Sequence, residues 1–241
     1  MTRRRWIADE VSGNRAAITG DHAAHLARVL RARVEQEFDI SAGNVVRRGR
    51  IVNVADDRVE FELGAEVSPT TSANVTLLLA IFKFDRMEWA IEKCTELGVA
   101  EIIPLIARRT DSHLAAASAK RLERWRRIAR QASEQSRRTA PLEISAPAKF
   151  HDALPRFGGL CIVLSESEDR LLLREILAAQ SATAITLAVG PEGGWTEDEL
   201  TSFQAAGWIS ASLGPTILRA ETAAIAATAI VLSQLQPSSA S

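Results

Sequence analysis

The pattern of apolar and polar positions changes along the chain at about residue 70. Before that point, short apolar runs alternate with turn-forming residues, as in 38–44, 50–57 and 58–64. Period-two alternation bounded by Gly, Asn and Asp is typical of short strands, and it predicts a small β-barrel or sandwich. A helix-like piece at 21–30 interrupts these strands, and residues 68–73 have the composition of a linker.

After the linker, strands and helices alternate. Residues 75–81 form a continuous apolar run, as expected of a strand covered on both faces. A helix is predicted over 85–97, with Asp85 and Glu88 as a capping-box pair and Gly98 at its end. Further strands are predicted at 101–106, 160–164, 184–189 and 209–213, and helices at 119–138, 168–180, 197–206 and 221–235. This alternation indicates an α/β domain with a mostly parallel sheet.

The composition fits a globular protein of one large or two moderate domains, with 241 residues, 46% hydrophobic and 24% charged. No run approaches the ~18 apolar residues of a membrane span. The charged N-terminus lacks the apolar stretch of a signal peptide. Cys94 and Cys161 lie in apolar segments, and the four histidines are scattered. We therefore expect no metal and a cytoplasmic protein.

The charge distribution is less even than the net charge of −1 suggests. Residues 108–138 hold ten Lys and Arg against three Asp and Glu, a balance of +7. Residues 139–241 hold five against eleven, a balance of −6. A basic segment of this kind fits either a polyanion contact or an ordinary solvated helix face. The absence of Tyr, with 5% aromatic residues, disfavours a platform that stacks single-stranded bases.

Residues 187–196 read as a strand that ends in a Gly-rich turn and opens a helix, Leu-Ala-Val-Gly-Pro-Glu-Gly-Gly-Trp-Thr. Glycines let the backbone approach a ligand closely, and free N–H groups at a helix start favour anions. The glycine spacing matches neither the P-loop nor the dinucleotide-binding fingerprint. Taken alone, Gly193-Gly194 is better explained as an ordinary strand-to-helix turn.

Residues 212–224 carry a second candidate site. A strand ends in Leu213-Gly214-Pro215, an irregular apolar loop follows, and Arg219 and Glu221 then precede an Ala-rich helix. An Arg and a Glu at a helix start can be a simple surface ion pair, worth ~0–1 kcal/mol. Taken alone, that interpretation is the better one.

Together the two segments resemble the RsmE-type family, ribosomal RNA (uracil-N3) methyltransferases of the knotted SPOUT class. The resemblance rests on Gly-Pro-Glu-Gly-Gly at 190–194 and Leu-Gly-Pro-x-Ile-Leu-Arg-x-Glu-Thr-Ala at 213–223. It extends to the segments 25–31, 86–99 and 132–138 and so covers nearly the whole chain. The chain departs from the family at Thr216, usually basic, and at Ala220, usually Thr, and it lacks the common Asp-Gly turn near 42–44. These departures concern the details of RNA binding.

The resemblance implies an α/β fold in two domains. Residues 1–70 would form a PUA-like RNA-binding β-barrel, and residues 74–241 a SPOUT methyltransferase domain with a trefoil knot. It also implies S-adenosylmethionine as cofactor, a homodimer, and a substrate uridine in the decoding region of 16S ribosomal RNA or the small ribosomal subunit. The alternatives are a SPOUT enzyme that acts on a ribose 2′-hydroxyl or another uridine, and a relative that binds RNA without turnover.

The resemblance also implies roles for individual residues. By position, the cofactor site would consist of Leu164, Gly190, Glu192, Gly194, Leu213, Gly214, Ile217 and Leu218. Arg219 is the candidate that stabilises negative charge on the uracil, and Glu221 or Glu192 would accept the N3 proton or orient the arginine. The expected phosphate contacts are Arg3, Arg4, Arg28, Arg31, Arg124, Arg127 and Arg138.

Overall fold

The structure is a computed structural model that describes residues 5–42, 45–67, 74–136, 138, 141–154, 157–180 and 182–235. The chain divides into two compact units. The N-terminal unit comprises Met1–Thr71 and Ser133–Pro141, and the C-terminal unit comprises Ser72–Ala132 and Leu142–Ser241. Within the described ranges, no helix has both the length and the apolar composition needed to cross a membrane.

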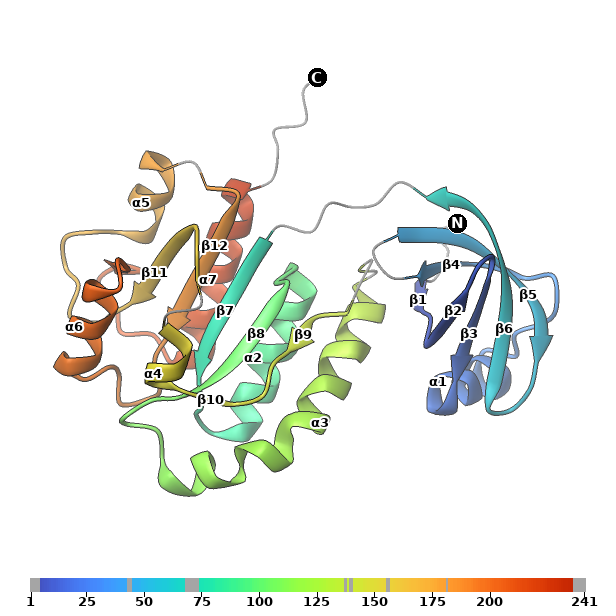
Figure 1. Cartoon of the computed structure of the whole chain (residues 1–241), viewed down its shortest axis with the longest axis horizontal. Coiled ribbons are helices and arrows are strands. Elements are labelled where there is room, and N and C mark those ends of the chain that lie inside the picture. The colour runs from blue at the N-terminus through green and yellow to red at the C-terminus, as the bar shows by residue number, and fades with distance from the viewer. Residues whose placement is uncertain are drawn as a thin grey trace. The chain divides into compact units, whose positions relative to one another are not determined.

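The N-terminal unit is built on a curled six-stranded sheet with strand order β1-β4-β5-β6-β3-β2 (Figure 1). Its strands are β1 (Arg5–Ile7), β2 (Glu10–Ser12), β3 (Arg15–Thr19), β4 (Glu37–Ala42), β5 (Val45–Val54) and β6 (Arg58–Val67). All neighbours are antiparallel except β1 and β4. Ile18, Ile40, Ile51 and Phe61 are fully buried in its core. The predicted helix at 21–30 is α1 (Gly20–Ala24), followed by one π-helical turn, η1 (His25–Val29).

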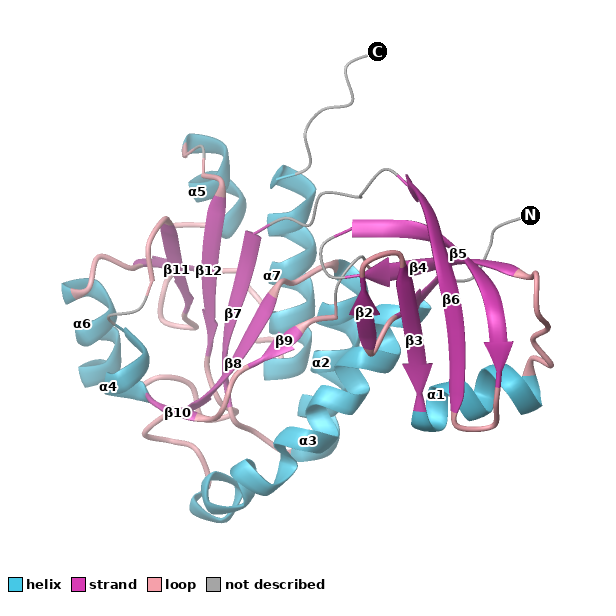
Figure 2. Ribbon diagram, turned by 45° about the vertical axis from the view of Figure 1, so that its right-hand side comes forward, coloured by secondary structure: helices cyan, strands magenta, loops and turns pink. Residues whose placement is uncertain are grey.

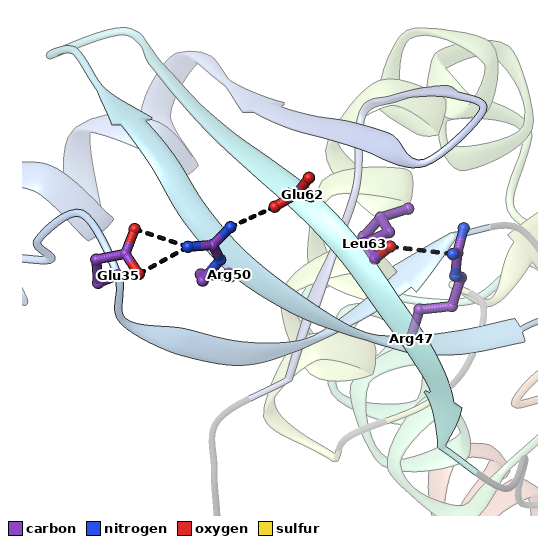
Figure 3. A network of polar contacts seen from close by, with 5 residues as sticks. All are labelled: Glu35, Arg47, Arg50, Glu62 and Leu63. Carbon is purple, nitrogen blue, oxygen red and sulfur yellow. Dashed lines mark hydrogen bonds and ion pairs between the residues drawn. The ribbon is translucent and has the colours of Figure 1, made fainter.

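Arginine side chains tie β5 and β6 together (Figure 3). Arg50 on β5 donates to both carboxylate oxygens of Glu35, at 2.9 and 2.7 Å, and to Glu62 on β6. Arg47 donates to the backbone carbonyls of Leu63 and Gly64. Exposed ion pairs of this kind add only about 0–1 kcal/mol each. Their consequence is that both arginines already have partners within the unit.

The C-terminal unit holds an all-parallel sheet with strand order β10-β8-β7-β12-β11-β13, and β9 also pairs with β8. Its strands are β7 (Asn74–Ala80), β8 (Glu101–Ile106), β9 (Glu143–Ile144), β10 (Ala148–Lys149), β11 (Leu160–Leu164), β12 (Ala184–Val189) and β13 (Ile209–Ala211). The predicted α/β class with a parallel sheet is confirmed. The last predicted strand, 209–213, ends two residues early.

Helices cover both faces of this sheet (Figure 2). They are α2 (Phe84–Leu97), α3 (Ser112–Gln135), α4 (Phe150–Ala153), α5 (Leu173–Ala179), α6 (Glu197–Ala205) and α7 (Ala220–Leu235). Alternate residues of β7 point to opposite faces. Leu77 and Leu79 pack in the cluster with α2, α5 and α7, whereas Leu78 and Ala80 pack with α4 and α6. This two-sided burial explains why the strands are continuous apolar runs.

The helix starts differ from prediction at α2, α3 and α5. The helix α2 begins at Phe84 after Lys83, without a side-chain cap, so the predicted Asp85–Glu88 capping box does not form. Glu88 instead accepts hydrogen bonds from Arg124 on α3. The helix α3 begins at 112 instead of 119, and α5 begins at 173 instead of 168.

Candidate active site

The candidate site lies where the loops that follow β11, β12 and β13 meet. Because these strands are parallel, their carboxyl ends share one edge of the sheet, the usual ligand-binding edge of α/β proteins. Residues of the loops 165–172, 190–196 and 212–219 line one cavity of about 1220 Å³. The first and third loops pair directly: Ser212 N donates to Leu171 O at 2.8 Å, and Leu173 N donates to Ser212 O at 2.9 Å.

The Gly-rich turn after β12 is a tight bend whose shape requires glycine at 194. Gly194 N donates to Pro191 O at 2.9 Å, and the φ angle of Gly194 is +68°. A Cβ atom there would come no closer than 3.7 Å to Glu166. The backbone angle, and not the close approach that the sequence suggested, is therefore what excludes other residues at this position.

Gly190 is needed for a different reason, which is the space for an indole ring. A Cβ atom on Gly190 would lie 3.2 Å from the ring of Trp195. The buried Trp195 in turn donates from Nε1 to Leu164 O, the last carbonyl of β11, at 3.0 Å. Trp195, which the sequence analysis left without a role, thus fixes the Gly-rich turn to the end of the neighbouring strand.

Arg108 and Arg109, which follow β8, contact the helix α6 and the Gly-rich turn. Arg109 donates from Nη1 to the carbonyl oxygens of Gly193, at 2.7 Å, and Trp195, at 3.2 Å. The backbone N–H of Arg108 donates to Glu199 Oε1 at 2.7 Å. Nothing in the sequence signals these contacts, because they join residues 84 to 91 positions apart.

The start of α6 does not act as an anion site. Thr196 and Glu199 form a capping box there: Glu199 Oε2 accepts from Thr196 N, and Glu199 N donates to Thr196 Oγ1. The first turn also carries Glu197 and Asp198. Since three acidic side chains already occupy the positive end of the helix dipole, the expected attraction for an anion at this helix start does not hold.

The structure brings all the predicted cofactor residues to this cavity. Its lining includes Leu164, Gly190, Glu192, Gly194, Leu213, Gly214, Ile217 and Leu218. The side chain of Ile217 is 79% exposed, although it belongs to an apolar loop. An exposed isoleucine on a cavity wall is suited to contact an apolar part of a ligand.

The two candidate catalytic residues occupy different positions. Arg219 is exposed and lines the cavity. Glu221 lies in the first turn of α7, is only 5% exposed, and is not among the described residues that line the cavity. Its Oε1 is 3.7 Å from Nε of Arg86, a residue of α2 that does line the cavity. The sequence analysis gave Arg86 no role.

The candidate RNA-binding arginines of the N-terminal unit differ in whether their side chains already have a partner in the protein. Arg28 donates to Asp56 at 2.9 Å, and both side chains are exposed. Arg31 is exposed and has no partner among the described residues, and its φ of 50° is unusual for a residue other than glycine. It directly follows the π-helical turn and Leu30. Arg3 and Arg4 lie outside the described residues.

The arginines from the basic segment 108–138 also differ. Both Arg124 nitrogens that contact Glu88 lie within 2.7 Å of its carboxylate oxygens. Arg127 is exposed and has no partner in the described ranges. Burial lowers the pKa of Arg138 to about 10. Of these three, Arg127 is therefore the one that is free to meet a phosphate without first breaking a contact.

Comparison with known proteins identifies the family. Residues 69–232 match a family model described as an RNA methyltransferase domain. The ribosomal RNA small subunit methyltransferase E of Rickettsia conorii is 34% identical over 235 residues, which is 95% of this chain and 94% of that protein. The chain belongs to the ribosomal RNA small subunit methyltransferase E family. The family resemblance drawn from the five sequence segments is thus confirmed.

Solved methyltransferase structures share the fold. The enzyme from Neisseria gonorrhoeae, bound to S-adenosylmethionine, gives a TM-score of 0.83 at 30% identity, covering 96% of this chain and 98% of that one. A putative methyltransferase from Legionella pneumophila, also in complex with S-adenosylmethionine, gives a TM-score of 0.83 at 27% identity, with 97% and 98% covered. The likeness extends over both units of the present chain.

Proposed function

We propose that the chain is an S-adenosylmethionine-dependent methyltransferase that methylates N3 of a uridine in the decoding region of 16S ribosomal RNA. The observation that carries the proposal is the cavity at the carboxyl edge of the parallel sheet, where the predicted cofactor residues and Arg219 lie together. Two relatives named for methylation of small-subunit ribosomal RNA, one of them solved with this cofactor, support the same activity, as does a putative methyltransferase solved with the same cofactor.

The residues of the cavity fit S-adenosylmethionine. At about 1220 Å³ the cavity exceeds the roughly 300–1,000 Å³ of common ligand sites, so it has room for the cofactor and a flipped base. Apolar side chains on its wall suit an adenine ring, and the tight turn at Gly194 brings backbone polar groups to the cavity. We propose that Leu164, Gly190, Glu192, Gly194, Leu213, Gly214, Ile217 and Leu218 hold it.

The cofactor supplies, when bound, a methyl group that is already activated by a positively charged sulfur. The uracil N3 would have to lose its proton to the protein before it could accept that methyl group, and the sulfur would keep the electron pair of the bond to the methyl carbon. The protein has to align N3, exclude water and stabilise the charge that spreads onto the uracil oxygens. Arg219, a permanent cation with several donors on the cavity wall, is the residue proposed to stabilise that charge.

Glu192 is the carboxylate that we propose as proton acceptor. It is exposed on the cavity wall, whereas Glu221 is buried next to Arg86. A proton acceptor has to come within hydrogen-bond reach of the N3 proton, directly or through one water. Glu221 is better placed to orient an arginine, which is the second role that the sequence left open for it.

The two units would divide the work. We propose that residues 1–70 form the PUA-like RNA-binding barrel, for which the curled six-stranded sheet is the support. Residues 74–241 would form the knotted SPOUT domain, in which Ser212 pairs with Leu171 and Leu173. Phosphate contacts are proposed for Arg3, Arg4, Arg28, Arg31, Arg124, Arg127 and Arg138, in a cytoplasmic enzyme.

We also propose a homodimer, supported by the character of α7. After Glu221 this helix carries no charged residue, yet Ile225, Ala226 and Ile230 are only partly buried. A helix that is apolar all round is normally buried, so a second copy of the chain is the proposed cover. Light scattering at micromolar concentration should then give twice the chain mass of 26.2 kDa.

Nucleoside mass spectrometry tests the proposed activity. Small ribosomal subunits that lack the modification would be incubated with the protein and S-adenosylmethionine, then digested to nucleosides. The expected product is 3-methyluridine at one equivalent or less per 16S RNA. A 2′-O-methylated nucleoside would assign the chain to another SPOUT reaction. Cofactor binding with no methylated nucleoside at all would indicate an RNA-binding relative without turnover.

A further inference from the structure

Arg86 and Glu221 form a charged pair next to the cavity, contributed by two different helices. Arg86 lies in the first turn of α2 and Glu221 in the first turn of α7, and the two helices pack against each other. Arg86 Nε is 3.7 Å from Glu221 Oε1, with side-chain exposures of 31% and 7%. At that distance the two groups attract each other as ions but make no hydrogen bond.

The partnering of Glu221 is incomplete for a buried carboxylate. Within the described part of the chain, its buried Oε2 accepts no hydrogen bond. Burial of a charge is costly unless the group is both ion-paired and hydrogen-bonded. The Arg86 guanidinium, at 3.7 Å, provides an ion pair but no hydrogen bond. A pair retained only for stability would be expected to have its hydrogen bonds complete, so this one points to a functional reason for keeping a carboxylate there.

The two terminal nitrogens of Arg86 remain available as donors, because its contact with Glu221 involves only Nε. No hydrogen bond from its terminal nitrogens to another described residue is found, and Arg86 lines the cavity. Arg219 lines the same cavity, and its guanidinium also has no partner among the described residues. Two guanidinium groups, one from α2 and one from the loop before α7, thus line one ligand site, and their terminal nitrogens have no partner among the described residues.

A uracil that has lost its N3 proton suits two guanidinium groups. Its negative charge is shared between the carbonyl oxygens at positions 2 and 4, which lie on either side of N3. Each oxygen is an acceptor, and each guanidinium is a donor with a permanent charge. Cytosine has an amino group at position 4, and a donor in that place would face a donor of the protein and be rejected.

We infer that Arg86 is a second cationic residue of the methyl-transfer site, which together with Arg219 binds the two carbonyl oxygens that flank N3 of the target uracil. In this arrangement Glu221 is a positioning residue: it directs the Arg86 guanidinium toward the cavity and does not touch the substrate. The inference rests on the proposed function and adds to it the way in which the site selects uracil.

The test is a set of variants measured in two independent assays. Arg86→Gln, Arg86→Lys, Glu221→Gln and the double variant Arg86→Gln/Glu221→Gln would be compared with Lys93→Gln. Lys93 is the matched control, because it lies on α2 but pairs with Glu92 and Glu96, at 2.7 and 2.8 Å. Calorimetry gives the affinity for S-adenosylmethionine, and single-turnover reactions with unmodified small subunits give the rate of 3-methyluridine formation.

Arg86→Gln should lower the single-turnover rate on the order of 10²–10³-fold, with the affinity for S-adenosylmethionine unchanged. Arg86→Lys should recover part of that rate, since it keeps the charge and loses the planar fork. If Arg86→Gln does not fold, the rate of Arg86→Lys alone still tests the inference. Glu221→Gln should be slower than wild type by a smaller factor, and the double variant no slower than Arg86→Gln, because Glu221 acts through Arg86.

Two results would overturn the inference while the proposed function stands. One is an Arg86→Gln protein that transfers methyl at the control rate but binds S-adenosylmethionine poorly, which would make Arg86 a cofactor ligand. The other is a double variant whose loss equals the product of the two single losses, which would remove the positioning role. A wild-type protein that forms no 3-methyluridine would overturn both the proposed function and this inference.

Discussion

Glu199 joins the start of α6 to the turn after β8, and its removal should lower both the stability of the protein and its affinity for the cofactor. Its side chain is 5% exposed. Oε1 accepts from the backbone N–H of Arg108 at 2.7 Å, and Oε2 accepts from Thr196 N and Oγ1 at 2.9 and 3.0 Å. The substitution Glu199→Ala removes all of these acceptors at once.

The cost follows from two of these contacts. Loss of the capping box typically destabilises by about 0.5–2 kcal/mol. The hydrogen bond of the Arg108 N–H is only partly buried, so leaving this group without an acceptor costs at most about 1–3 kcal/mol. We therefore expect Glu199→Ala to lower the free energy of unfolding by about 2–4 kcal/mol, allowing for partial rescue by water. Glu199→Gln, which retains one acceptor oxygen, should lose about half of that.

The effect should reach the cofactor because Arg109 follows Arg108. When the turn at 107–110 loosens, the hydrogen bonds from Arg109 to Gly193 and Trp195 lose their support. If ordering this turn then costs about 1.4 kcal/mol of the binding free energy, the Kd for S-adenosylmethionine rises on the order of tenfold. Urea unfolding and calorimetry measure the two effects separately.

Glu197→Ala is the control for this experiment. Glu197 lies in the same first turn of α6 but is exposed, and its loss should cost only the helix-dipole contribution of about 0.3–1 kcal/mol. If Glu199→Ala were no less stable than Glu197→Ala, the link from α6 to the turn after β8 would not hold. If stability fell but cofactor affinity did not, the link would be structural only.

Three further predictions follow from single residues. Gly194→Ala should weaken S-adenosylmethionine binding in calorimetry, because φ is +68° there, whereas an unchanged affinity would show that the turn relaxes freely. Arg127→Gln should reduce the slope of log K against log salt concentration for RNA binding by about one. Arg124→Gln should reduce this slope by less, because Glu88 already neutralises Arg124, and equal slopes for the two variants would contradict this. Burial raises the pKa of the Cys94 thiol from 9.0 to about 12. The unfolded chain therefore loses this proton first as pH rises above 9.0, and stability measured by urea unfolding should fall toward pH 12, less steeply in Cys94→Ala.

The parallel sheet could be predicted because its strands carry a strong local signal. The strands at 101–106, 160–164 and 184–189 have the predicted bounds, because both faces of the sheet are covered and these strands are therefore mostly apolar. The gathering of the loop residues at one cavity follows from parallel strand order, once the sheet is known. The short strands β1, β9 and β10 have two or three residues and no periodicity to detect.

The contacts that shape the site could not be predicted, because they join distant parts of the chain. Arg86 and Glu221 meet only after α2 and α7 pack, and Arg109 reaches Gly193 only once β8 and β12 share a sheet. The sequence also could not show that Glu221 is buried while Glu192 is exposed. Nor does the sequence indicate that Arg219 is exposed while Glu221, two positions later, is buried.

The role of Arg219 can be tested directly by single-turnover methylation of small ribosomal subunits at several pH values. The account predicts that Arg219→Ala lowers the rate on the order of 10²–10³-fold while S-adenosylmethionine affinity stays nearly intact. Raising the pH should partly restore the rate, since the uracil then loses its N3 proton more often without help. A variant that methylates at the wild-type rate but binds S-adenosylmethionine poorly would make Arg219 a cofactor ligand and contradict the account.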